Sequence, residues 1–238
     1  MATKRLVVIG GAGALGRGVV SHFTRASWKA LSVDFAKNEE SASSFVFKSG
    51  AKSTLTQASD LVEHVKSFGK VDAVVCTAGG WAGGSVKDAD SLVNLAEMHA
   101  KNTESAVLAA HLAANVLSPR GLLVLTGAAA ALQATPGMVS YGISKAGTHH
   151  LIASTVDALP DDTTVLGVLP ATIDTPTNRM YMANADFSTW TTIDSIAAKI
   201  HEWADADPKD RPSSGHLVTV LTNNHKNVWT DVGNPFLQ

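Results

Sequence analysis

The apolar residues of this chain fall into two patterns that follow one another from end to end. Short, unbroken apolar runs rich in β-branched residues are typical of strands buried on both faces of a parallel sheet. A weak run occupies residues 45–47, and the clear ones lie at 6–9, 30–33, 71–76, 122–126, 164–169 and 217–221. Between them, apolar residues recur with helical spacing at 14–26, 58–68, 91–117, 140–159 and 194–206. This alternation predicts an α/β fold, a doubly wound parallel sheet of about seven strands with helices on both faces.

Two segments do not follow the alternation. Residues 176–192 combine a proline and asparagines with aromatic and methionine side chains, and long segments of this kind are usually lids or binding loops. We therefore expect a substrate loop at about 176–193, and an extended or partly disordered polar tail at 222–238. No repeat or linker-like stretch interrupts the sequence, so a single domain over residues 1–238 is expected.

Composition narrows the class of protein. Hydrophobic residues make up 45% of the chain and charged residues 17%, below the roughly 25% typical of globular domains, which excludes wholesale disorder. Lysine and arginine number 19 against 21 acidic residues, so no broad basic field exists for nucleic acid or a membrane surface. The single cysteine, Cys76, excludes an internal disulfide, and the nine histidines lack metal-ligand spacing, so no metal is expected.

The start of the sequence resembles a secretory signal for a few residues only. Glycines from Gly10 onward and the charge of Arg17 interrupt the apolar run that such a signal needs. No run elsewhere approaches the roughly 18 apolar residues of a membrane span. A cytoplasmic protein is therefore expected.

A glycine-rich loop joins the first predicted strand to the first predicted helix. Its residues are Gly10, Gly11, Ala12, Gly13, Ala14, Leu15 and Gly16. Gly11, Gly13 and Gly16 match the GxGxxG spacing, in which missing Cβ atoms let the backbone approach a pyrophosphate at a helix N-terminus. The placement predicts a Rossmann-type dinucleotide site, and the alternative is a glycine turn without a ligand.

An acidic residue ends the second predicted strand. Asp34 follows Gly16 by about the 20 residues at which a carboxylate accepts hydrogen bonds from an adenosine ribose and repels a 2′-phosphate. This favours NADH over NADPH, although Arg17 and Lys37 lie close enough in sequence to soften the discrimination. The alternative is an ordinary helix or turn cap.

A tyrosine and a lysine stand four residues apart in a predicted helix. Tyr141 and Lys145 therefore lie on one face, one turn apart. A nearby ammonium is expected to lower the tyrosine pKa from its ordinary value near 10 and make the phenol a proton donor. The alternative, a surface pair, is the commoner origin of this spacing, but the nucleotide loop favours catalysis.

These motifs together resemble the short-chain dehydrogenase/reductase superfamily over nearly the whole length. The resemblance implies that Ala78, Gly79 and Gly80 bind the cofactor. It also implies that Lys145 contacts the nicotinamide ribose and that the segment containing Pro170, Ile173 and Thr175 holds the carboxamide. The sequence departs from the superfamily at Ala128, where a serine is usual, at Cys76-Thr77 and at Ala14. Without the serine, no hydroxyl polarises a substrate carbonyl, so the protein is either inactive or acts on a substrate that needs less help.

Longer strings are similar to the dihydropteridine reductase family, which also lacks the serine. They are the glycine loop and residues 32–34, 38–40, 78–84, 135–138, 174–179, 185–190 and 211–215. The resemblance implies reduction of quinonoid dihydropteridine (dihydrobiopterin) to the tetrahydro form with NADH, or less favourably NADPH, with Tyr141 as proton donor assisted by Lys145. The alternatives are a reductase for another quinonoid or carbonyl compound and a nucleotide-sensing regulator without turnover.

Substrate and subunit contacts complete the expectations. Trp81 is predicted to stack on the pterin beside Ala128 and Tyr141, the alternative being a core or hinge tryptophan. Asn178 is expected either to bind the pterin edge or to cap a helix, and Trp190 and residues 180–182 to pack within a lid. Alanines crowd the helices predicted at 91–117 and 140–159, and the resemblance implies a homodimer through them. The alternative is that they fit these helices against their own sheet.

Overall fold

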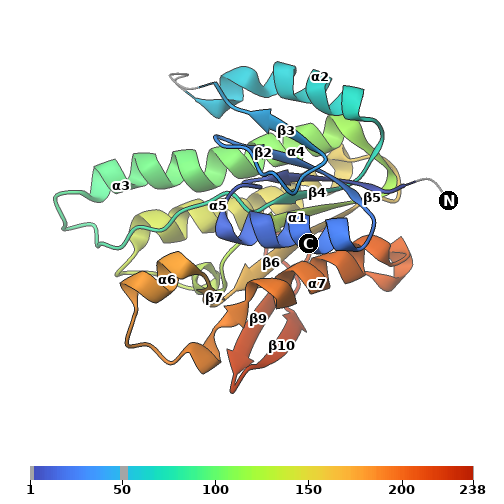
Figure 1. Cartoon of the computed structure of the whole chain (residues 1–238). Helices are drawn as coiled ribbons and strands as arrows, with labels where there is room; N and C mark the ends of the chain where they lie inside the picture. Colours follow the sequence, from blue (N-terminus) through green and yellow to red (C-terminus); the bar gives the residue numbers. More distant parts are fainter. Residues whose placement is uncertain (1–2, 49–52, 238) are drawn as a thin grey trace.

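A central sheet organises the fold in the computed structural model, which describes residues 3–48 and 53–237. Within these residues eight strands form the sheet, all parallel except the antiparallel strand at one edge (Figure 1). Across the sheet the order is β10 (Lys226–Asp231), β9 (Leu217–Asn223), β6 (Thr164–Pro170), β5 (Leu117–Thr126), β4 (Val71–Cys76), β1 (Arg5–Ile9), β2 (Lys29–Asp34) and β3 (Ser43–Val46).

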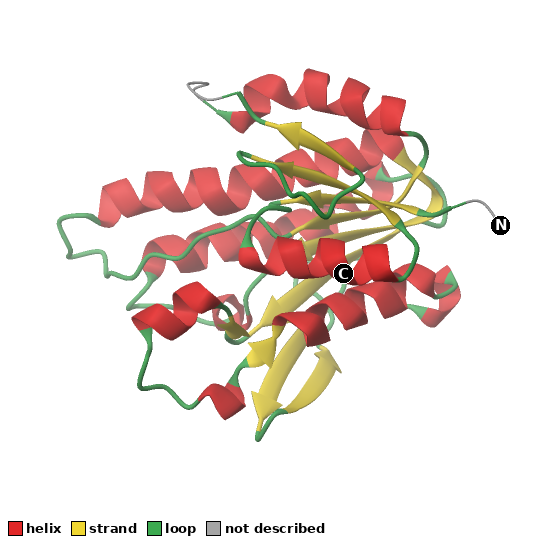
Figure 2. Ribbon diagram, viewed as in Figure 1, coloured by secondary structure: helices red, strands yellow, loops and turns green. Residues whose placement is uncertain are grey.

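Helices cover both faces of this sheet, as Figure 2 shows. One face carries α1 (Ala14–Arg25) and α7 (Ile193–Asp205), and the other carries α2 (Ala58–Phe68), α4 (Ser105–Val116) and α5 (Val139–Thr155). The helix α3 (Ser91–Met98) runs into α4 through a π-helical turn, and α6 (Pro176–Tyr181) is a short helix near β7 (Ile173–Asp174) and β8 (Thr191–Thr192). In the described part of the chain, no helix is long and apolar enough to cross a membrane.

Two apolar cores lie on the two faces because side chains alternate along each strand. In β1, Val7 and Ile9 join the core under α2, α4 and α5, while Leu6 and Val8 join the core under α1 and α7. Both sets are essentially inaccessible to solvent. The doubly wound α/β arrangement expected from unbroken apolar runs is therefore confirmed, with eight strands rather than about seven.

The polar tail, expected to be extended or partly disordered, contains an extended strand that belongs to the sheet. Residues 226–231 form β10, which pairs antiparallel with β9 along its whole length. Asn224 and His225 both have positive φ, the conformation of a tight hairpin turn that matches the twist of the two strands. The apolar pattern did not predict this strand, because it lies at the sheet edge and most of its side chains are polar and exposed.

The segment expected to be a long loop is partly ordered into short elements. Thr175 caps α6 by accepting a hydrogen bond from the Asn178 amide, and Pro176 occupies the first turn of that helix. A 3-10 turn at Phe187–Thr189 follows, and β8 then pairs in parallel with β7. The segment is thereby tied at both ends to the carboxyl side of β6.

A half-buried arginine, Arg211, connects elements at the opposite end of the molecule. The Arg211 guanidinium donates hydrogen bonds to the carbonyl oxygens of Gly121, Trp203 and Ala206 and to the Thr164 hydroxyl, at 2.8–3.2 Å. Trp203 and Ala206 belong to the end of α7, where carbonyls lack helical partners. Arg211 thus joins the C-terminus of α7 to the middle of β5 and the first residue of β6.

Candidate active site

The glycine loop lies where the strand order of the sheet reverses. From β1 the chain passes outward to β2 and β3 and then returns to β4 on the other side of β1, which leaves a crevice at the carboxyl ends of β1 and β4. In open α/β sheets, ligands bind at such a switch point. The loop and the segment that begins at Thr77 face each other across it, since the Thr77 hydroxyl donates to the carbonyls of Ile9 and Gly10.

Two glycines of the loop sit where a side chain has no room. Gly10 has φ +85°, and a Cβ there would collide with the Ala78 backbone. A Cβ at Gly16 would collide with the Gly10 carbonyl. Gly13 then precedes the first turn of α1 at Ala14, so unpaired helix N–H groups open toward the crevice. This cradle fits the pyrophosphate of a dinucleotide.

Leu15 is in a different environment from the rest of the loop. Its side chain is buried in the core beneath α1, and only its backbone remains for the crevice. The Leu15 side chain therefore does not face the crevice, and the predicted cofactor contact of Leu15 could come only from its backbone.

Asp34 ends β2 beside this loop. One carboxylate oxygen accepts from the Ala12 amide at 2.8 Å and the other accepts from the Phe35 amide at 2.7 Å. The side chain thus supports the loop as a turn cap would. A carboxylate has about four lone-pair sites, so acceptor positions remain for a ribose diol.

A cavity of about 890 Å³ extends from the glycine loop and Asp34 to the start of α4. Besides the expected residues it is lined by side chains that the sequence interpretation did not single out: Phe35, Lys48, Ser53, Gln57 and Glu104. Thr77, Ala78 and Gly79 form its wall on the β4 side. Its position fits the adenosine half of a dinucleotide, and it does not reach Tyr141.

Tyr141 and Lys145 lie one turn apart near the N-terminus of α5, as expected. Lys145 is only 5% exposed, and its Nζ donates to the Thr126 carbonyl oxygen at 2.8 Å. Burial lowers the pKa of Lys145 to about 8. A Cβ on Gly79 would lie 3.4 Å from Nζ, so the ammonium reaches the wall of the crevice.

The expected direction of the tyrosine pKa is wrong in this structure. Burial raises the pKa of Tyr141 to about 12, because the Lys145 ammonium is directed to Thr126 and does not offset the loss of hydration. The phenol is therefore fully protonated at neutral pH, which is the state a proton donor requires.

Asn102 is a site residue that sequence reasoning missed. Its amide nitrogen donates to the Gly80 carbonyl at 3.1 Å and to the Ser144 hydroxyl at 2.9 Å, and its oxygen accepts from the Gly80 amide. It lies in the π-helical turn at His99–Glu104 and is 2% exposed. Such turns are frequent at functional sites. The available signal was an asparagine on the apolar face of an alanine-rich helix.

Trp81 projects from the loop that follows Gly80. Its indole lies over Gly83 and is 66% exposed, which excludes a core role. The loop is held against the segment before α5, because the Gly84 amide donates to the Gly137 carbonyl and the Val139 amide to the Gly84 carbonyl. Stacking on a flat substrate remains a prediction for an aromatic face presented in this way.

The segment after β6 brings its expected residues together through backbone contacts. β6 ends at Pro170, Ile173 begins β7 and Thr175 caps α6. The side-chain amide nitrogen of Asn178, Nδ2, donates to the Ile173 carbonyl at 2.8 Å. Asn178 therefore fixes the segment in this structure, and its predicted contact with a substrate remains untested.

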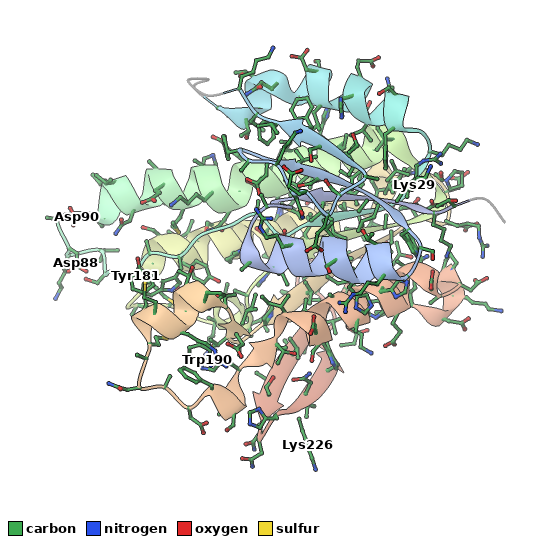
Figure 3. The ribbon with its side chains drawn as sticks, in the orientation of Figure 1. Lys29, Asp88, Asp90, Tyr181, Trp190 and Lys226 are labelled. Carbon is green, nitrogen blue, oxygen red and sulfur yellow. The ribbon has the colours of Figure 1, made fainter. Side chains whose placement is uncertain are left out.

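Neighbouring side chains stiffen α6 further. Arg179 makes a bidentate ion pair with Asp174 and lies over the Phe187 ring at 4.4 Å. Trp190 is buried against Phe187, whereas Tyr181 is exposed at the end of α6 (Figure 3).

In the described residues, no three His, Cys, Asp or Glu side chains gather as a metal site requires.

Comparison with known proteins identifies the class. The model of the short-chain dehydrogenase family matches residues 4–186, and the chain belongs to this family of NAD(P)H-dependent oxidoreductases. A dihydropteridine reductase of Dictyostelium discoideum is 42% identical to it over 234 residues, which are 97% of this chain and 100% of the relative.

Solved structures agree on the fold. A short-chain dehydrogenase/reductase from Serratia marcescens superimposes with a TM-score of 0.75 at 20% identity, covering 91% of this chain and 95% of that one. A short-chain dehydrogenase family protein from Francisella tularensis gives the same TM-score at 18% identity, covering 92% of this chain and 97% of that one. At these identities the likeness concerns the fold alone.

Proposed function

We propose that the protein reduces quinonoid dihydropteridine to tetrahydropteridine with NADH. The observation that carries the proposal is the full-length similarity, at 42% identity, to a protein named dihydropteridine reductase. The absence of a side-chain hydroxyl at Ala128 supports it, because a quinonoid ring is already electron-poor and needs no hydroxyl to polarise it. The same feature disfavours an ordinary carbonyl substrate.

The residues of the chain divide the work as follows. The glycine loop and the start of α1 hold the pyrophosphate, Asp34 accepts from the adenosine ribose, and the segment at Pro170–Thr175 orients the nicotinamide. Bound NADH supplies the hydride. Trp81 stacks on the pterin, and Tyr141 donates the proton. Lys145 places its ammonium at the crevice wall beside Gly79, where it binds the nicotinamide ribose and provides positive charge.

The test is an assay of NADH oxidation with freshly generated quinonoid dihydropterin. Turnover at a rate that saturates with both substrates is expected. Folded protein that binds NADH but does not turn over would overturn the proposal and favour a nucleotide-sensing role.

Replacing Asp34 by Asn is expected to shift the cofactor preference toward NADPH. Asparagine keeps an oxygen for the Ala12 amide but removes the negative charge that repels a 2′-phosphate. A hydrogen bond to a charged group is worth about 1.5–3 kcal/mol, so the NADH/NADPH ratio of kcat/KM should fall about tenfold or more. An unchanged ratio would remove Asp34 from the ribose site.

Turnover is expected to fall as the pH rises above about 8. The pKa of Lys145, lowered by burial to about 8, means that its ammonium is present below that pH and lost above it. The pKa of Tyr141 and that of Cys76, raised by burial to about 12 and about 11, lie outside the window. A profile of kcat from pH 6 to 10 measures the effect, and a flat alkaline limb would contradict the role of the ammonium.

We also propose a homodimer through α4 and α5. Val107 and Ile143 are exposed on these helices, and a Cβ on Gly147 would meet no atom within 4 Å, which leaves room for a second copy. The molar mass in solution decides between this arrangement and a monomer whose alanines serve its own sheet.

A further inference from the structure

A buried histidine lies on the same helix as the Tyr141–Lys145 pair. His149 follows Lys145 by one turn of α5 and is 2% exposed. Its Nε2 accepts a hydrogen bond from the backbone amide of Ala128 at 3.3 Å. Because an amide N–H can only donate, Nε2 carries no proton in this contact, and the neutral ring holds its proton on Nδ1.

The same ring packs directly on the end of β5. A Cβ on Gly127 would lie 2.5 Å from Nε2 and 2.9 Å from a Leu169 methyl, so Gly127 leaves the space that the imidazole fills. One turn earlier, Lys145 binds the Thr126 carbonyl. Residues 126–128 are therefore attached to α5 by two hydrogen bonds, one from each side of Gly127.

Charge and backbone contacts keep this arrangement in place. Burial, assisted by the Lys145 ammonium, lowers the pKa of His149 to about 4, so the ring stays neutral in ordinary buffers. The backbone carbonyl of His149 accepts a hydrogen bond from the side-chain amide nitrogen of Asn234, which also donates to the Gly215 carbonyl. The ring and the backbone carbonyl of His149 are thus each held by a hydrogen bond.

We propose that His149 is a positioning residue for the reaction, which sets the distance between residue 128 and the Tyr141–Lys145 pair. This inference rests on the proposed function, in which residue 128 borders the substrate. Because residue 128 offers no hydroxyl to the substrate, a larger part of the rate acceleration depends on how the backbone positions the substrate. A misplacement of about 1 Å is enough to slow a reaction about 10²-fold.

Three substitutions separate the hydrogen bond from the packing. Gln places a polar group near the Nε2 position, Asn places one near Nδ1, and Leu fills similar space without an acceptor. We expect His149→Leu and His149→Asn to lower kcat roughly 10- to 100-fold with little change in NADH affinity, and His149→Gln to recover most of the loss. His64→Leu, in α2 and away from this contact, is the matched control and should keep wild-type kcat.

A second readout does not depend on turnover. Hydrogen exchange at the Ala128 amide should be slow in the wild type and in His149→Gln and faster in the other two variants, and the ¹⁵N shift of Nε2 should report an unprotonated nitrogen. If the wild type fails to reduce quinonoid dihydropterin, the proposed function falls while these measurements still test the hydrogen bond. Wild-type kcat in folded His149→Asn, or equal losses in His149→Gln and His149→Leu, would overturn the positioning role.

Discussion

Replacing Tyr141 by phenylalanine is expected to lower kcat about 10²- to 10⁴-fold, the range usually contributed by a positioned proton donor. Phenylalanine fills the same volume but has no proton to give. Because burial raises the pKa of Tyr141 to about 12, the wild-type phenol is protonated throughout the pH range from 6 to 10 in which turnover is measured. No side-chain hydrogen bond of Tyr141 is found among residues 3–48 and 53–237, so little stability should be lost. Steady-state kinetics with quinonoid dihydropterin measure the change.

Tyr181, the second of the two tyrosines in the chain, provides the matched control. It is 77% exposed at the end of α6, and Tyr181→Phe should keep kcat within about twofold of the wild type. NADH binding, followed by fluorescence titration, should be unaffected in both variants. Near-normal turnover in Tyr141→Phe would remove Tyr141 from proton transfer, and lost NADH binding would assign it to the cofactor site instead.

Replacing Arg211 by methionine is expected to destabilise the fold by about 3–5 kcal/mol. Methionine keeps an apolar stem, but three backbone carbonyls and the Thr164 hydroxyl lose their donor in a part-buried setting, where a polar group left unpaired costs about 1–3 kcal/mol at most. At about 2–4 °C per kcal/mol for a domain of this size, Tm should fall by on the order of 10 °C. Thermal unfolding followed by circular dichroism measures it.

Arg120 is the control for this substitution. It lies on the surface, where its guanidinium makes one ion pair with Asp207 at 2.6 Å. Exposed pairs contribute about 0–1 kcal/mol, so Arg120→Met should move Tm by no more than a few degrees. Equal shifts in the two variants would mean that the bonds of Arg211 do not hold α7 to the sheet.

The parallel part of the fold could be predicted because burial on both faces leaves a local mark, an unbroken apolar run. β10 could not, since its side chains are mostly exposed and its pairing with β9 depends on the turn at Asn224 and His225. The π-helical turn at His99–Glu104 was hidden for another reason. Apolar periodicity continues on both sides of it, so one helix was expected over residues 91–117 where the structure has α3, the turn and α4.

The site residues, too, are of two kinds: those that a local sequence pattern predicts and those whose contacts form only between distant parts of the chain. The glycine loop and the Tyr141–Lys145 spacing are local patterns, and the structure places both where they were expected. Asn102 and His149 act on backbone groups 22 and 21 residues away, at Gly80 and Ala128, and no sequence spacing announces such contacts. The direction of the tyrosine pKa was wrong because charge proximity follows from spacing, whereas burial follows only from the assembled fold.

The contact between Asn234 and the His149 carbonyl has a consequence for synthesis of the chain. The two residues are 85 positions apart, which at about 5–20 residues per second corresponds to about 4–17 s of translation. The helix α5, which carries Tyr141 and Lys145, therefore leaves the ribosome well before the residue that binds its His149 carbonyl. A nascent chain can therefore complete β1, β4 and α5 before this hydrogen bond becomes available.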